Sequence, residues 1–108
     1  MTATFVRERI TALRLQKGVS EYKMSYDLGH SRGYINNISS GKALPSLTEL
    51  FAICDYFGIS IIDFFDESVA NPTLSKQITE ELKHLSNNDL LLALQLIRRL
   101  GKDTKPHS

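Results

Sequence analysis

Apolar residues recur at intervals of three or four positions along most of the chain, which is the spacing of an amphipathic helix. In residues 5–17, Val6, Ile10 and Leu13 fall on one such face. No segment alternates apolar and polar residues for long, and the chain has no Asn-Gly or Asp-Gly pair to favour a β-hairpin. Four further helical segments follow, at residues 21–28, 32–40, 46–57 and 60–66. The pattern therefore predicts an all-α fold.

Glycines and serines mark the ends of these segments. A glycine accepts the left-handed conformation that closes many helices, and five glycines follow an apolar segment: Gly18, Gly29, Gly41, Gly58 and Gly101. A serine can accept a hydrogen bond from a free backbone N–H at a helix start, and four serines are placed to do so: Ser20, Ser31, Ser46 and Ser60. Ser46 and Glu49 also form a capping-box pattern.

The segments 46–57 and 60–66 supply many of the expected core residues. By their spacing these are Leu47, Leu50, Phe51, Cys54, Phe57, Ile61, Ile62, Phe64 and Phe65. Cys54 is the single cysteine of the chain, which excludes an internal disulfide and a Cys-based zinc cluster. We expect it to be buried, because a free cysteine behaves as a small hydrophobic residue.

The character of the sequence changes after Asp66. The pair Asn71-Pro72 is typical of a loop, and two more helical segments follow it, at 74–85 and 87–100. The expected organisation is a first domain at 1–68, a linker at 69–73, a helical pair at 74–101 and a disordered tail at 102–108.

Length and composition fit a small globular protein. The chain has 108 residues, of which 42% are hydrophobic and 23% charged, and these are ordinary globular values. The longest aliphatic run, Leu90–Leu94, is far shorter than the ~18 residues of a membrane span. Charged residues follow the N-terminus too soon for a signal peptide. We therefore expect a cytoplasmic protein with no membrane partner.

The net charge of +1 hides an uneven distribution of charge. Residues 1–42 hold seven basic and three acidic residues, residues 43–82 one and seven, and residues 83–108 five and two. The three parts therefore carry +4, −6 and +3. Either these are ordinary solvated surfaces, or the basic N-terminal part faces a polyanion.

The stretch from Ser20 to Gly41 carries the strongest indication of function. Two short helical segments flank the turn Gly29-His30-Ser31, which is too short for antiparallel packing. The helices must cross steeply, as in a helix-turn-helix, whose second helix can enter the major groove of DNA. Ser25 is small enough to lie where the two helices touch, and Ile35 and Ile38 can anchor the second helix.

Over about residues 5–66 the chain resembles the phage-repressor-like (Xre/Cro) helix-turn-helix family. The resemblance rests on four motifs: Arg9-Ile10-x-x-Leu13-Arg14-x-x-Lys17-Gly18-Val19-Ser20, Leu28-Gly29-His30-Ser31-Arg32-x-Tyr34-Ile35-x-x-Ile38, Gly41-Lys42-x-x-Pro45-Ser46 and Phe57-Gly58-Ile59-Ser60. It implies a five-helix, lambda-repressor-like DNA-binding domain. It also implies a transcriptional regulator that works as a dimer on a near-palindromic operator.

The resemblance implies a recognition helix that starts after Ser31. Four residues then fall where the family reads bases: Arg32, Gly33, Asn36 and Asn37. Arg can bind guanine O6 and N7, and Asn can bind adenine N6 and N7, each pair giving roughly 1–3 kcal/mol of discrimination. Six residues are candidates for phosphate contacts, which position a protein without specifying sequence: Ser20, Lys23, Ser31, Tyr34, Ser40 and Lys42.

At some positions the chain departs from the family's pattern. The family commonly has a phosphate-binding Gln where this chain has Glu21, whose carboxylate repels phosphate unless it turns inward or pairs with Lys17 or Arg14. Many members have Glu-Asn in place of Ser39-Ser40, and that Glu usually pairs with the arginine matching Arg14. A second function therefore stays open: a protein-interaction module or antitoxin-like subunit that keeps the fold with weak DNA affinity.

The last helical segment is apolar over a wider sector than one partner covers. Leu91 and Leu92 lie outside the stripe formed by Leu90, Leu94, Ile97 and Leu100, and Leu96 lies at its margin. Either the C-terminal helices fold back on the first domain, or Leu91, Leu92 and Leu96 belong to a homodimer interface. A dimer would space two recognition helices ~34 Å apart, so that they read successive turns of one DNA face.

No pattern of residues indicates an enzyme. The sequence has no nucleophile–base pair, metal-ligand spacing or phosphate-binding loop, and its three histidines are far apart. We expect no catalytic residue, no metal, no cofactor and no evident small-molecule effector. The expected partners are double-stranded DNA and a second copy of the chain.

Overall fold

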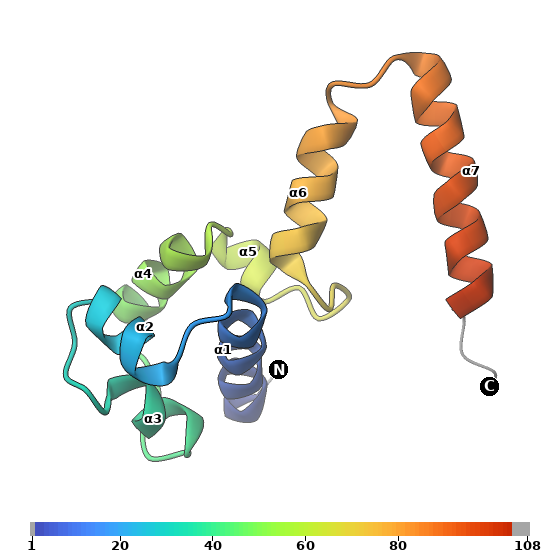
Figure 1. Ribbon diagram of the computed structural model, residues 1–108. Helices are drawn as coiled ribbons and strands as arrows, with labels where there is room; N and C mark the ends of the chain where they lie inside the picture. The colour runs from blue at the N-terminus through green and yellow to red at the C-terminus, as the bar shows by residue number, and fades with distance from the viewer. Residues whose placement is uncertain (1, 105–108) are drawn as a thin grey trace. The chain divides into compact units, whose positions relative to one another are not determined.

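Helices account for all the regular secondary structure in the part of the chain that the computed structural model describes, residues 2–104 (Figure 1). In chain order they are α1 (Ala3–Lys17), α2 (Glu21–Asp27), α3 (Tyr34–Ser39), α4 (Leu47–Phe57), α5 (Ile61–Phe64), α6 (Pro72–Leu82) and α7 (Asn87–Thr104). The predicted all-α fold is confirmed.

The chain divides into two compact units, one up to Ser75 and one from Lys76 onward. The first unit holds α1 to α5, and their apolar side chains form a single core. Its buried members are Ile10, Leu13, Met24, Ile35, Ile38, Leu50, Ile53, Cys54, Phe57, Ile59 and Phe64. Cys54 is 3% exposed, so this cysteine packs as a hydrophobic residue, as predicted. The same burial raises the pKa of its thiol to about 11.

The buried face of α4 differs from the predicted one. Leu47 and Phe51 were expected in the core but are largely exposed, whereas Ile53 is fully buried. The core stripe of α4 is Leu50, Ile53, Cys54 and Phe57, which follows the spacing i, i+3, i+4, i+7. Phe51 lies off this stripe, and Leu47 is the first residue of the helix, beyond the edge of the core. Ile62 of α5 was also expected inside and is exposed.

Most helix ends follow the predicted signals. The side chains of Ser20, Ser46 and Ser60 accept hydrogen bonds from backbone N–H groups three residues on, and Ser46 with Glu49 completes a capping box. Gly18, Gly29, Gly41 and Gly58 have positive φ.

Two predicted helix ends are wrong. Ser31 does not cap α3, because that helix begins at Tyr34 with Gly33 at its N-cap and no side-chain cap bond. Gly101 does not end α7, which continues to Thr104. A helix interior tolerates glycine at a cost of about 1 kcal/mol, and Lys102 in the last turn interacts favourably with the C-terminal dipole. Part of the predicted tail is therefore helical, and residues 105–108 lie outside the described residues.

Arg9 of α1 holds the segment that follows α5. Its guanidinium donates hydrogen bonds to four backbone carbonyl oxygens, those of Phe64 (3.0 Å), Asp66 (2.6 Å), Val69 (2.7 Å) and Ala70 (3.5 Å). The arginine is 7% exposed. The end of the first domain and the start of the expected linker are thereby fixed to α1.

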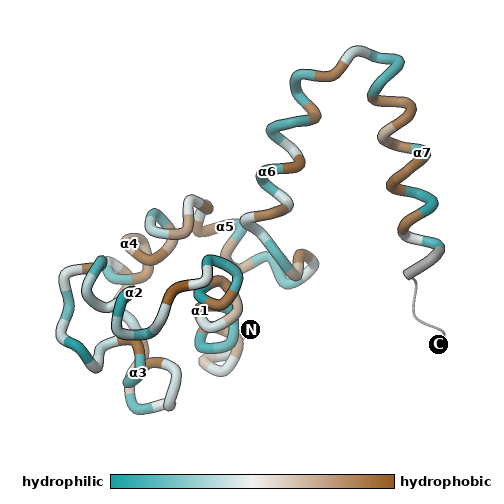
Figure 2. The backbone as a smooth tube through the Cα atoms, viewed as in Figure 1, coloured by the Kyte–Doolittle hydropathy of each residue, from teal (hydrophilic) through white to brown (hydrophobic). Residues whose placement is uncertain are grey.

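The second unit exposes a large apolar surface. Figure 2 shows apolar positions recurring along α6 and α7 at helical intervals. On α7 the exposed apolar residues are Leu90, Leu91, Leu92, Leu94, Leu96, Ile97 and Leu100. Leu91, Leu92 and Leu96, the predicted dimerisation residues, are 59%, 63% and 57% exposed.

Candidate nucleic-acid interface

Ser25 joins α2 to α3 at the point where the two helices meet. The residue is fully buried, and its hydroxyl group donates to the Glu21 carbonyl oxygen at 2.8 Å. The hydroxyl oxygen of Ser25 in turn accepts from the backbone N–H of Ile35 at 3.1 Å. The N–H of His30 binds the Ser25 carbonyl oxygen at 2.9 Å, which closes the turn after Gly29 (φ +76°). Ser25 therefore fixes the position of α3 against α2, in the place predicted for it.

The outer face of α3 and the turn before it is polar. Ile35 and Ile38 are buried beneath this face. All four residues predicted to read bases are exposed: Arg32, Gly33, Asn36 and Asn37. These four residues are thus accessible to a partner that approaches α3 from outside.

Aromatic side chains surround Arg32. The Arg32 guanidinium lies 5.6 Å from the centre of the Tyr22 ring, a cation–π arrangement between α2 and the residue just before α3. The His30 and Tyr34 rings stack at 3.8 Å. A shallow hollow at the surface is lined by four residues: Tyr22, Tyr26, His30 and Arg32.

Glu21 binds two side chains of α3. Its Oε1 accepts from Asn36 Nδ2 at 3.2 Å and its Oε2 accepts from Ser39 Oγ at 2.5 Å. The hydrogen bond from Ser39 is the largest of the effects that lower the pKa of Glu21. Burial opposes it, and the bond from Asn36 and the charge of Arg14 lower the pKa by smaller amounts. Arg14 itself donates to the Val19 carbonyl oxygen at 2.9 Å. The carboxylate is therefore held chiefly by α3 and not by an ion pair.

Several of the basic residues that the sequence placed in a basic N-terminal surface bind groups of this chain. Arg7 donates to the Gly41 carbonyl oxygen at 3.3 Å, and Arg9 and Arg14 also bind backbone carbonyls. The Lys17 ammonium lies 4.8 Å from the centre of the Tyr56 ring. The surface that can face a polyanion is consequently smaller than the sequence indicated.

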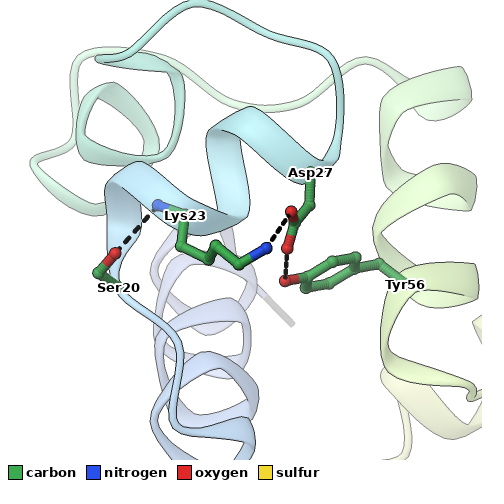
Figure 3. A network of polar contacts seen from close by, with 4 residues as sticks. All are labelled: Ser20, Lys23, Asp27 and Tyr56. Atoms are coloured by element: carbon green, nitrogen blue, oxygen red, sulfur yellow. Dashed lines mark hydrogen bonds and ion pairs between the residues drawn. The ribbon is translucent and has the colours of Figure 1, made fainter.

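Lys23, a predicted phosphate contact, is paired with an acidic residue. Figure 3 shows Lys23 of α2 and Tyr56 of α4 meeting the carboxylate of Asp27, at 2.6 Å and 2.7 Å. The hydrogen bonds from Lys23 and Tyr56 lower the pKa of Asp27. Ser20 caps α2 by accepting from the Lys23 backbone N–H at 3.0 Å, which leaves its hydroxyl proton free to donate.

Tyr34 was also predicted to contact phosphate, and its position argues against this. The hydroxyl oxygen is enclosed within the protein, and burial together with the Glu49 carboxylate raises the pKa of Tyr34. The remaining candidates, Ser31, Ser40 and Lys42, are exposed.

The sequence did not reveal that α2 contacts two of the side chains that were predicted to read bases. Tyr22 and Glu21 contact Arg32 and Asn36 across the turn, at separations of 10 and 15 residues. Helical periodicity reports only which residues share a face within one helix. The departure from the family's pattern at Glu21 was the one signal that this position needed a partner.

The helix pair joined at Ser25, with an exposed polar edge on its second helix, is a helix-turn-helix unit. Residues 10–64, just over half of the chain, match the family model described as helix-turn-helix. The chain belongs to this Xre/Cro-like helix-turn-helix family, a family of DNA-binding regulators that are generally not enzymes. Neither the curated proteins nor the solved structures give a match to the chain.

Among the described residues, no helix is both long and apolar enough to cross a membrane. Within the same residues, no three His, Cys, Asp or Glu side chains are grouped so that they can hold a metal ion.

Proposed function

We propose that the chain is a sequence-specific transcriptional regulator that places α3 in the major groove of DNA and acts as a dimer on a near-palindromic operator. The observation that carries the proposal is the exposed edge formed by Arg32, in the turn before α3, and by Asn36 and Asn37 on α3, a helix whose opposite face is buried. Arg and Asn are the side chains best suited to bidentate contacts with guanine and adenine.

Within this proposal, Arg32 reads guanine and Asn36 and Asn37 read adenine. Gly33 has no side chain and allows the backbone to approach the DNA closely. Phosphate contacts come from Ser20, Ser31, Ser40 and Lys42, all of which are exposed or half-buried. Lys23 contributes only when phosphate competes with Asp27 for its ammonium group.

The proposed dimer forms through the second unit. Leu91, Leu92 and Leu96 are exposed on a helix that carries other exposed apolar residues, and apolar surface of this extent is typical of a protein interface. A second copy of the same helix is a suitable partner, because a two-fold interface pairs identical patches. A DNA-binding regulator of this kind acts in the cytoplasm.

A specific observation favours a second candidate function, a protein-interaction module or antitoxin-like subunit. Arg7, Arg9 and Arg14 bind backbone carbonyls of this chain, Lys23 binds Asp27, and Glu21 adds a negative charge next to α3. The pairing of Lys23 and the charge of Glu21 reduce the attraction to phosphate, and the three arginines have fewer N–H groups left to bind it. For this candidate the exposed edge of α3 would face a protein.

Selection of bound DNA from a random pool, followed by footprinting, tests the proposal. We expect the selected DNA to contain two half-sites. We also expect the mass of the protein–DNA complex to correspond to two copies of the protein. Arg32→Ala should change the selected bases at one position of each half-site, whereas Lys42→Ala should weaken binding to all sequences alike. No enrichment of any sequence at low salt, together with a stable protein partner that co-purifies, would favour the second candidate.

A further inference from the structure

Glu21 connects the two helices of the helix-turn-helix, α2 and α3, through its side chain. It is the first residue of α2, and each of its two carboxylate oxygens accepts a hydrogen bond from a different side chain of α3. Asn36 is exposed, so core packing does not hold it in place. The contact with Glu21 at 3.2 Å is what restricts the Asn36 amide.

The chemistry of this contact fixes which way the Asn36 amide points. A carboxylate can only accept hydrogen bonds, so it must face the NH₂ group of the amide and not its oxygen. One N–H of Asn36 is used by Glu21. The other N–H and the amide oxygen remain, and these are one donor and one acceptor side by side. This pair matches the N7 acceptor and the N6 donor that adenine presents in the major groove.

We propose that Glu21 is a positioning residue for base reading: it holds the Asn36 amide in the single orientation that matches adenine, and so sets the base preference at that position. This inference rests on the proposed function of α3. Ser39 supports the arrangement, because its hydroxyl binds the second oxygen of Glu21 and restrains the carboxylate. Without Glu21 the amide can rotate by half a turn, which exchanges its donor and acceptor and removes the match to adenine.

Glu21→Gln tests the inference with almost no change of shape. A glutamine amide can both donate and accept, so it binds the Asn36 amide in either orientation. We expect the preference for adenine over the other bases at the position read by Asn36 to fall about three- to tenfold, a part of the discrimination that a bidentate contact provides. Overall affinity should rise, because a negative charge near phosphate is removed.

The measurement is the dissociation constant for the selected site and for the three sites with another base pair at that position, at one salt concentration. Glu8→Gln serves as the matched control, because it removes the same charge from an exposed position of α1. Its base preference should equal that of the wild type. A two-dimensional NMR spectrum of each variant verifies that the fold is retained.

A double variant separates positioning from a structural role. In the Asn36→Ala background, Glu21→Gln should cause no further change in base preference, whereas a purely structural effect would persist there. An unchanged adenine preference in Glu21→Gln, or an effect that persists without Asn36, overturns the inference while the proposed function stands. Failure to select any DNA with the wild-type chain overturns both.

Discussion

Replacing Arg9 should destabilise the first unit more than any other change of a single charged residue on α1. The guanidinium is 7% exposed and donates to four carbonyl oxygens, three of them within 3.0 Å, and it lies 5.0 Å from the centre of the Phe5 ring. In Arg9→Ala these carbonyls lose their donor, and the end of α5 is no longer held to the segment up to Ala70.

The magnitude follows from the hydrogen bonds. A bond to a charged group contributes roughly 1.5–3 kcal/mol, so the three short bonds at the lower value amount to about 4–5 kcal/mol. Water can replace the donor at Asp66 and Val69, which are half-buried. We therefore expect Arg9→Ala to lower the free energy of unfolding by about 3 kcal/mol, a large share of the 5–15 kcal/mol typical of a domain. Arg9→Lys should lose about half as much, because an ammonium retains the charge but reaches fewer carbonyls.

Urea denaturation followed by tyrosine fluorescence measures this loss in the full chain. All four tyrosines, at positions 22, 26, 34 and 56, lie in the first unit, and the chain has no tryptophan. The signal therefore reports the unfolding of that unit alone. Glu8→Ala, at an exposed neighbouring position on the same helix, is the control and should change stability by less than about 0.5 kcal/mol. A loss below about 1 kcal/mol in Arg9→Ala would refute the assigned role of these hydrogen bonds.

Three further predictions concern stability and assembly. Ser25→Ala should cost about 2 kcal/mol in the same urea assay, because the buried N–H of Ile35 loses its acceptor; a cost near zero would contradict the role given to Ser25. The pKa values of Glu21, Asp27, Glu49 and Asp66 are lowered by hydrogen bonds made in the folded state. These carboxylates therefore contribute fully to stability at a pH above their ordinary pKa values, 4.5 for Glu and 3.8 for Asp. The contribution is lost as the pH falls through their lowered pKa values. The urea midpoint should be steady from pH 7 to about pH 5 and drop below that, and a midpoint that rises on acidification is the opposite result. If the proposed dimer forms, Leu92→Glu should convert it to a monomer in sedimentation experiments. It should also weaken binding to the proposed operator with two half-sites but not to one half-site, whereas an unchanged mass would exclude this surface.

The sequence predicted the local features of the fold well because those features depend on near neighbours in the chain. The caps at Ser20, Ser46 and Ser60 need only a residue three positions on. Leu47 and Phe51 of α4 were wrongly predicted to lie in the core. The sequence alone does not show which of several apolar faces of a helix the other helices cover.

The contacts that distinguish this chain lie between residues far apart in sequence. Arg9 binds carbonyl oxygens 55 to 61 residues away, and a backbone acceptor has no signature in the sequence. Its guanidinium was therefore counted with the basic surface. The bond from Asn36 to Glu21 was missed for the same reason, although the unusual residue at position 21 marked the place. Pattern analysis locates helices and their turns, but it does not pair polar side chains between helices.

The contacts made by the basic residues within the chain determine how many of them are left to attract DNA. Attraction to DNA through phosphate grows with the number of free cationic groups, and the dependence on salt grows with it. In residues 1–42, three arginines bind backbone carbonyls, Lys23 is paired with Asp27 and Lys17 lies over the Tyr56 ring. The exposed cations that flank α3 in the sequence are therefore Arg32 and Lys42. Binding to arbitrary sequences should then be weak. A regulator with so little general attraction depends on correct base contacts, and these require side chains held in place before the DNA arrives. Under the proposed function, the contacts of Tyr22 with Arg32 and of Glu21 with Asn36 would provide that restraint from α2.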